Sequence, residues 1–137
     1  MILSYKKYGS AGLPVIILHG LFGSGRNWHA IANYLSNTHI VYTVDLPNHG
    51  NSPHTEWMDY PQMVEVLQSL LAQLGLTSVN VIGHSMGGKV AMWMALSYPD
   101  SIGKLVVVDI APINYAHSFE QILQCLEAMH LDKIHSR

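Results

Sequence analysis

Charged side chains are scarce in this sequence of 137 residues. Lys, Arg, Asp and Glu together make up 12% of it, about half the usual share of roughly 25%. Seven basic and nine acidic residues give a net charge of −2, so the chain has neither the basic surface that binds nucleic acid nor a polybasic run for an anionic membrane. A chain so poor in charge is expected to cover part of its surface with further protein.

Cysteines, long apolar runs and a signal segment are also lacking. The single cysteine, Cys125, cannot form an internal disulfide and fits a reducing compartment. No uninterrupted apolar run approaches the roughly 18 residues of a membrane-spanning helix, and the first residues do not follow the signal-peptide pattern. The hydrophobic content of 49% excludes disorder. We therefore expect a globular cytoplasmic protein that does not enter the membrane.

Apolar runs alternate with helical patterns along the chain. Continuous runs rich in β-branched residues predict buried strands at residues 14–18, 40–44, 79–82 and 105–108. The intervals predict helices at residues 27–35, 61–74, 86–98 and 118–129, and residues 2–8 predict an outer antiparallel strand. This alternation is typical of an α/β fold, in which right-handed crossovers place helices on both faces of a mostly parallel sheet.

The most informative motif is Gly83-His84-Ser85-Met86-Gly87, between a predicted strand and a predicted helix. Small residues two positions before and after Ser85 permit a sharp turn that exposes a strained serine, an arrangement called a nucleophile elbow. The start of the helix would direct free N–H groups at the place where an oxyanion forms. The motif therefore predicts a nucleophilic serine. The alternative is a plain turn in which the glycines only ease packing.

The same segment also matches most of a phosphate-binding loop, from Gly83 to Lys89. That loop requires Ser or Thr after the lysine to hold magnesium, and this chain has Val90 there. An isopropyl group cannot bind a metal, which argues against a nucleotide-binding function. The nine histidines form no metal-binding pattern such as H-E-x-x-H either. We expect neither a metal nor a cofactor.

A glycine-rich turn at residues 19–25 directly follows the first predicted buried strand. A turn at this position would let the Leu21 N–H join the Met86 N–H as the two donors of an oxyanion hole. An ordinary turn is again the alternative. His19 is expected to brace the turn by hydrogen bonds rather than to carry a proton.

A third motif follows the next predicted strand at residues 45–52. Its Pro and Gly residues indicate a turn, which Asp45 and His49 are expected to hold together.

In this order and spacing, the motifs resemble the α/β-hydrolase superfamily, and within it the small esterases of the YbfF type, related to the abhydrolase domain-containing 11 group. The resemblance covers essentially the whole chain and rests on residues 19–28, 45–52, 83–89, 105–112 and 119–137. It implies the α/β-hydrolase fold, with the N-terminal part of its core at residues 1–115 and the start of a helical cap at residues 116–137.

The resemblance also implies roles for individual residues. Ser85 would be the nucleophile of an ester or thioester hydrolase that acts on small acyl substrates, and Leu21 and Met86 would supply the oxyanion N–H groups. Asp109, after the strand that follows the elbow, would be the acid of the triad; the alternative is a capping or loop carboxylate.

The side chains of Phe22 and Trp28 would line an apolar acyl pocket, although each serves equally well in a core.

The histidine base is the member of the triad that this sequence does not supply. In the superfamily it follows the last strand, beyond the cap. His84 lies beside Ser85 and is expected to point away from the hydroxyl, and no motif surrounds the later histidines, which are His117, His130 and His135. A serine without its base is a poor nucleophile. The chain is therefore expected to be the N-terminal half of a hydrolase, inactive alone.

Two alternatives of another class remain. One is a pseudoenzyme that binds a ligand on the same fold without turning it over. The other is a non-functional remnant of a truncated reading frame. In the chain as it stands, the strand at residues 105–108 would leave an apolar sheet edge open to self-association.

Overall fold

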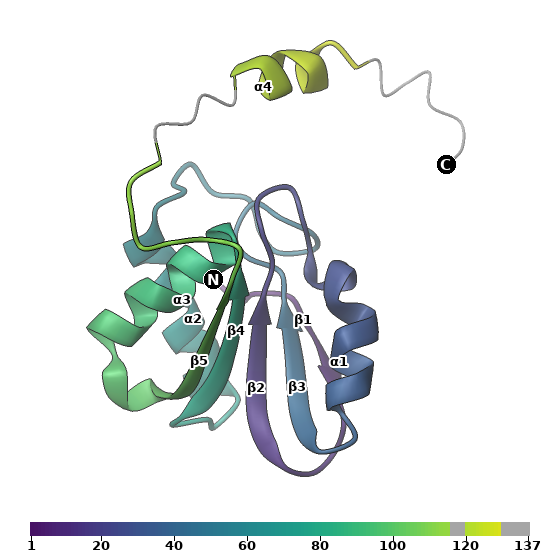
Figure 1. Cartoon of the computed structure of the whole chain (residues 1–137), viewed down its shortest axis with the longest axis vertical. Helices are drawn as coiled ribbons and strands as arrows, with labels where there is room; N and C mark the ends of the chain where they lie inside the picture. The colour runs from purple at the N-terminus through teal and green to yellow at the C-terminus, as the bar shows by residue number, and fades with distance from the viewer. Residues whose placement is uncertain (116–119, 130–137) are drawn as a thin grey trace.

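A five-stranded sheet forms the centre of the computed structural model, which describes residues 1–115 and 120–129 (Figure 1). The strands lie in the order β1-β3-β2-β4-β5. Strand β1 pairs antiparallel with β3, and the other pairs are parallel. Their bounds are Tyr5–Tyr8 (β1), Leu13–Leu18 (β2), His39–Val44 (β3), Val79–His84 (β4) and Ile102–Val108 (β5). The predicted parallel sheet with an antiparallel outer strand is confirmed.

Helices cover both faces of this sheet. Helix α1 lies on one face, and α2 and α3 lie on the other (Figure 1). Two short 3₁₀ turns, η1 and η2, precede α1 and β5, and α4 follows the last strand. Their bounds are Gly25–Trp28 (η1), His29–Leu35 (α1), Tyr60–Gln73 (α2), Met86–Ser97 (α3), Pro99–Ser101 (η2) and Glu120–Glu127 (α4).

Strand β2 divides the core because its side chains alternate between the two faces. Ile16 and Leu18 pack with α2 and α3, whereas Val15 and Ile17 pack with Ala32 of α1. All of these side chains are buried. A run that is apolar at every position is therefore required here, as the sequence predicted.

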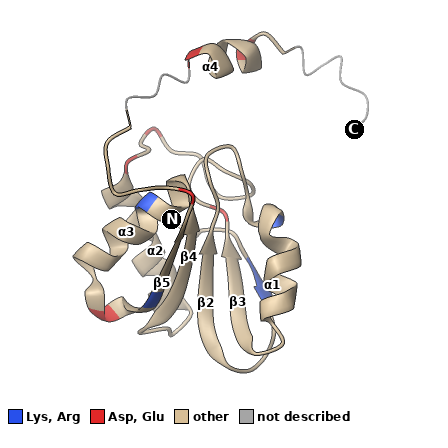
Figure 2. Cartoon of the chain, in the orientation of Figure 1, with Lys and Arg blue, Asp and Glu red and all other residues tan. Residues whose placement is uncertain are grey.

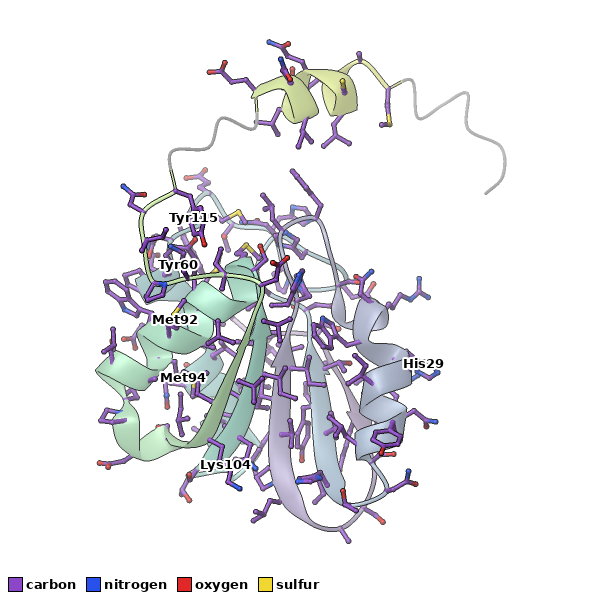
Figure 3. All side chains as sticks on the ribbon, in the orientation of Figure 1. His29, Tyr60, Met92, Met94, Lys104 and Tyr115 are labelled. Carbon is purple, nitrogen blue, oxygen red and sulfur yellow. The ribbon has the colours of Figure 1, made fainter. Side chains whose placement is uncertain are left out.

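Helix α2 buries the apolar stripe that its sequence predicted. Met63, Leu67, Leu70 and Leu71 are all buried, and each such side chain stabilises the fold by roughly 1.5–3 kcal/mol. The Asp59 carboxylate caps the helix by accepting the Gln62 N–H at 2.9 Å. From α3, Met94 is buried in the same layer (Figure 3).

Several predicted boundaries differ from the structure, most by one or two residues. Strand β5 begins earlier than expected because Ile102 already pairs with Val79 of β4. The outer strand is shorter, since only Tyr5–Tyr8 pairs with β3. The helix predicted at residues 27–35 begins as a 3₁₀ turn. Residues 118–119 of the last predicted helix lie outside the described residues.

Strand β5 leaves one edge of the sheet open. Among the described residues it pairs only with β4, and Leu105 and Val106 are exposed. Charged residues are sparse on the ribbon (Figure 2). Helix α4 buries none of its residues, and its apolar side chains Ile122, Leu123 and Leu126 are exposed, as is Met129 just after it. The chain that is poor in charged residues thus exposes apolar side chains on the edge of β5 and on α4.

Within residues 1–115 and 120–129, no helix is long and apolar enough to cross a membrane.

Candidate active site

Ser85 occupies the sharp turn between β4 and α3, with φ 50° and ψ −116°. A sparsely populated conformation of this kind costs a non-glycine residue roughly 1–3 kcal/mol, so tight packing must hold it. A methyl group on Gly83 would collide with the Gly87 carbonyl, and one on Gly87 would lie 2.5 Å from the Leu18 carbonyl oxygen. Only glycines allow the start of α3 to approach β4 and β2 this closely. The predicted strand, turn and helix around Ser85 are confirmed.

A tight turn at residues 20–23 lies against Ser85. The Gly23 N–H donates to the Gly20 carbonyl at 3.0 Å, and Phe22 has φ 61°, whereas Leu21 has a negative φ. This combination defines a type II turn. A methyl group on Gly20 would lie 3.3 Å from the Ser85 Cβ, so the turn touches the serine.

The two N–H groups predicted as oxyanion donors lie on either side of this contact. Leu21 follows Gly20, and Met86 is the first residue of α3. The Gly87 N–H donates to the His19 carbonyl at 3.1 Å, which joins the two segments. Neither the Leu21 nor the Met86 N–H donates a hydrogen bond to another described residue. Both donors are therefore available to a ligand.

Two neutral histidines hold the turn at residues 20–23 in place through hydrogen bonds of their ring nitrogens. The Nδ1 atom of His19 lies 2.8 Å from the Gly20 carbonyl oxygen, so it carries the hydrogen, and Nε2 accepts the Leu46 N–H at 3.0 Å. His49 repeats the pattern: Nδ1 donates to the Pro47 carbonyl at 2.9 Å, and Nε2 accepts the Phe22 N–H at 3.2 Å. The predicted bracing role of His19 is confirmed.

Burial lowers the pKa of His19 below its usual 6.5, and the neighbouring His49 adds to the effect, against the opposing hydrogen bond to Gly20. The side chain is only 1% exposed. Protonation would also replace the acceptor of the Leu46 N–H with a donor. The folded protein therefore requires the neutral imidazole.

Acid should destabilise the fold through His19. Its pKa is lower in the folded than in the unfolded chain, so its contribution is complete above pH 6.5 and is lost as the pH falls through the folded-state pKa. Urea unfolding across this range measures the effect. His19→Gln should be less stable at neutral pH and should lose less stability on acidification, whereas the exposed His54→Gln should follow the wild type. Equal slopes for wild type and His19→Gln would contradict this.

The Asp45 turn is held by its own side chains. The carboxylate accepts the N–H groups of Gly25 at 2.7 Å and Asn51 at 2.9 Å, and the Ser52 hydroxyl donates to the Asp45 carbonyl at 2.6 Å. Gly50, at φ 56°, packs directly on this carboxylate, where a side chain would clash. The predicted structural roles of Asp45 and His49 are confirmed.

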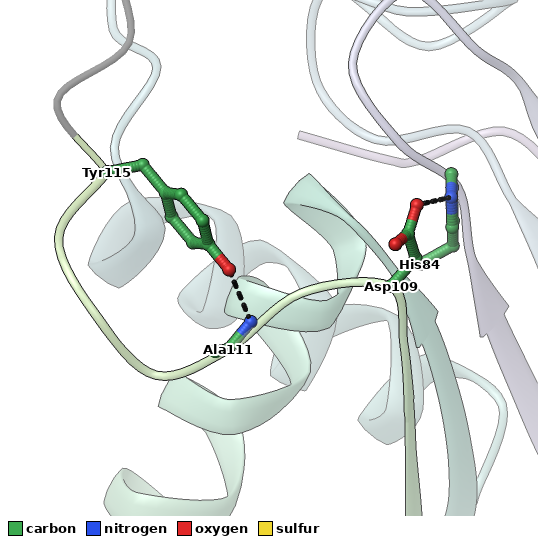
Figure 4. Close-up of polar contacts among 4 residues, drawn as sticks. All are labelled: His84, Asp109, Ala111 and Tyr115. Atoms are coloured by element: carbon green, nitrogen blue, oxygen red, sulfur yellow. Dashed lines mark hydrogen bonds and ion pairs between the residues drawn. The ribbon is translucent and has the colours of Figure 1, made fainter.

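Asp109 lies immediately after β5 and beside the elbow. The Ser85 N–H donates to the Val108 carbonyl at 3.0 Å, so the two strand ends are bonded to each other. Asp109 has φ 55°, its side chain is 87% exposed, and one carboxylate oxygen lies 3.9 Å from His84 Nε2 (Figure 4). The carboxylate is therefore open to a further partner.

A strap that the sequence did not predict holds the chain after Asp109. The Lys89 ammonium group donates to the Ile113 carbonyl and lies 5.0 Å from the centre of the Tyr115 ring. The Tyr115 hydroxyl accepts the Ala111 N–H at 2.9 Å (Figure 4). Val90, which stands where a phosphate-binding loop needs Ser or Thr, is fully buried in the core. The two Lys89 contacts join residues 24 or more apart, and no local sequence pattern predicts them.

Two cavities flank the turn at residues 20–23. One, of about 310 Å³, includes Phe22, Trp28 and His84 in its lining; the other, of about 350 Å³, includes Phe22, His49 and Met58. Phe22 is 57% exposed. Trp28 also packs against the buried cluster that includes Ala32 of α1, so it both lines this cavity and contacts the core.

The described residues supply no obvious base for Ser85. The ring of His84 lies between Asp109 and Trp28, with its centre 6.1 Å from that of Trp28. Three further histidines, His117, His130 and His135, lie outside the described residues. Within the described part of the chain, no group of three or more His, Cys, Asp or Glu residues could hold a metal ion.

Known proteins are similar to this chain in sequence and in fold. Residues 14–128 match the family model described as alpha/beta hydrolase fold. The chain is 50% identical to the mouse (Mus musculus) sn-1-specific diacylglycerol lipase ABHD11 over 82% of its length and 38% of that protein's length. It is 43% identical to Esterase YbfF of Escherichia coli, over 74% of the chain and 40% of the esterase.

A solved structure, titled Marine microorganism esterase, superposes with a TM-score of 0.91 at 46% identity, covering 93% of this chain and 51% of that one. The chain thus spans about two-fifths to one-half of the relatives that it matches. A family match over most of the chain, supported by close relatives and by the superposed fold, is decisive. The chain belongs to the alpha/beta hydrolase fold family.

Proposed function

We propose that the whole protein hydrolyses small acyl esters or thioesters, with Ser85 as its nucleophile. The observation that carries this proposal is the positive φ of Ser85 at the start of α3. Such a conformation is retained where it serves a function, and here it would present the hydroxyl to the Leu21 and Met86 N–H groups, which donate to no other described residue. The relatives named esterase and lipase support hydrolysis as the reaction class.

In the proposed reaction, the Ser85 hydroxyl attacks the acyl carbon and gives its proton to a base. The N–H groups of Leu21 and Met86 stabilise the oxyanion of the tetrahedral intermediate. The intermediate expels the alcohol or thiol, which takes the proton from the base. Water then releases the acid from the acyl-serine by the same steps, and Ser85 recovers its proton.

Asp109 is the proposed acid of this triad. Its carboxylate would accept a hydrogen bond from the base, hold the imidazole in the right tautomer and stabilise its protonated form. The position of Asp109 at the end of the strand beside the elbow supports this role, as does its exposed carboxylate. Phe22 and Trp28 would contact the acyl chain, since they line the cavity on one side of the turn.

A fluorophosphonate probe tests the function directly, because it labels only an activated serine. The sample is this chain together with a polypeptide that corresponds to the region of the Escherichia coli esterase that the chain does not cover; we call this pair the reconstituted enzyme. Mass spectrometry should find the label on Ser85. Ester hydrolysis without a label on Ser85 would refute the proposed nucleophile. Neither labelling nor hydrolysis, in a pair that assembles, would favour the ligand-binding pseudoenzyme.

The 137-residue chain alone is expected to hydrolyse esters very slowly and to associate with itself. Oxyanion donors without a complete triad retain only a small part of the catalysis. The exposed edge of β5, with Leu105 and Val106, is the kind of edge that pairs with other chains.

Size-exclusion chromatography combined with an ester assay checks both expectations. The reconstituted enzyme should be smaller than the self-associated chain and should regain hydrolysis. As a control, Val106→Lys should reduce association of the chain alone without creating activity, because a charge on the edge opposes pairing. A monodisperse, fully active monomer of this chain would contradict the prediction and would require one of its own histidines as the base.

A further inference from the structure

His49 accepts a hydrogen bond from the central peptide of the turn that lies against Ser85. Turns of type I and type II share the same outer hydrogen bond, here from Gly23 to Gly20, and differ in the direction of the central peptide. In the structure that peptide, between Leu21 and Phe22, directs its N–H at His49 Nε2. The turn is type II although Phe22 is not a glycine and type I would spare it the positive φ.

The strain at Phe22 and the hydrogen bond to His49 are similar in size. A positive φ disfavours a non-glycine residue by about as much as one hydrogen bond of this kind favours the fold. Without an acceptor at His49, the central peptide would be free to rotate by about half a turn into type I. The Leu21 carbonyl would then point where the Phe22 N–H points now, and the Phe22 side chain would leave its present place.

We propose that His49 is a positioning residue, whose neutral imidazole holds residues 20–23 in a type II turn and so fixes the place of the Phe22 ring in the cavities that flank the turn. The inference rests on the proposed function, because it assigns His49 a part in shaping that site. The structure also places the residues involved together, since Phe22, His49 and Met58 line the same cavity next to the turn. The residue acts through the turn and does not touch the reacting atoms.

Protonation of His49 would favour the other turn. Its Nδ1 already donates to the Pro47 carbonyl, so an added proton must go to Nε2, which would then require an acceptor. The rotated peptide offers one, the Leu21 carbonyl. Two ionisable groups accompany His49 here. The ring of His19 lies 5.0 Å away, and the Asp45 carboxylate on the same turn already accepts two backbone N–H groups. The turn thus has two discrete arrangements: type II when His49 is neutral, and the rotated, type I form when His49 is protonated.

Nuclear magnetic resonance of the full chain tests the inference without any catalysis. At about pH 8, the imidazole nitrogens of His49 should show the Nδ1–H tautomer. As the pH is lowered, the Phe22 amide signal should move together with the imidazole signals that report protonation of His49. A Phe22 amide that ignores that protonation would overturn the inference.

Two substitutions of the same residue give the sharper comparison. In His49→Gln, an amide oxygen can accept the Phe22 N–H and cannot be protonated, so the Phe22 signal should stay near its neutral position throughout. In His49→Leu, with no acceptor, it should be displaced at every pH. His54→Gln, at an exposed position of the following segment, is the matched control. A wild-type Phe22 signal in folded His49→Leu would overturn the inference.

Kinetics of the reconstituted enzyme separate this inference from the proposed function. His49→Leu should lower kcat/KM by about 10–100-fold, as expected for a small displacement of a positioned group, and His49→Gln should recover most of that loss and keep more activity in acid than the wild type. Unchanged kcat/KM in His49→Leu would refute the role in catalysis. If Ser85→Ala retained full hydrolysis, the proposed function would fail, while the amide measurements would still decide whether His49 controls the turn.

Discussion

Replacement of Ser85 by alanine should abolish ester hydrolysis by the reconstituted enzyme, with a loss of kcat on the order of 10⁶-fold. This is the scale observed when the nucleophile of a serine triad is removed. The change deletes the only atom that would bond to the acyl carbon, and it leaves the oxyanion donors in place. It should scarcely affect folding, because alanine keeps the Cβ and the strained backbone does not depend on the hydroxyl.

Hydrolysis of a short-chain p-nitrophenyl ester measures this effect, with thermal unfolding to confirm that the variant is folded. Ser97→Ala is the control, because Ser97 lies on the same helix, is exposed and is far from the turn in sequence. It should retain wild-type kcat. Appreciable, saturable turnover by folded Ser85→Ala would assign the nucleophile to another residue.

Replacement of Asp109 by asparagine should lower kcat by about 10⁴-fold, the scale seen when the acid of a triad loses its charge. Asparagine keeps the size of the side chain and tolerates a positive φ, so φ 55° at this position should persist. What is lost is the negative charge that would stabilise the protonated base.

The same ester assay, with Asp100→Asn as the matched control, decides this prediction. Asp100 is an exposed aspartate in the 3₁₀ turn before β5. Its neutralisation should leave kcat unchanged. Near-normal hydrolysis by Asp109→Asn would place the acid of the triad elsewhere and leave Asp109 with a structural contact to His84.

The framework of the site could be predicted from the sequence because it depends on local patterns. Apolar runs placed β2 and β4, and the spacing of Gly83 and Gly87 around Ser85 placed the turn. The conformation of Ser85 follows from sterics that act within a few residues of the chain. Such signals survive in a single sequence, and each of these elements was found where it was expected.

The contacts between distant segments could not be predicted. The bond from the Phe22 N–H to His49 spans 27 residues, and the strap from Lys89 to Ile113 spans 24. Neither contact has a periodicity or a motif, because both depend on how loops approach one another after the sheet has formed. The glycine-rich turn could be located from the sequence, whereas its type could not, since Phe22 gives no indication of a positive φ.

The hydrogen bond from the Gly87 N–H to the His19 carbonyl has a consequence for substrate selection. It fastens the turn at residues 20–23 to the first turn of α3, and the close packing of Gly87 on Leu18 leaves no slack between them. The helix itself is anchored by Val90, Ala91 and Met94 in the core. A bulky group pressed against this side of the serine would therefore have to shift the whole helix. We therefore expect the segment formed by residues 20–23 and the start of α3 to be rigid. Acyl groups that fit against it would be accepted, and larger ones would be rejected because the segment does not move to accommodate them.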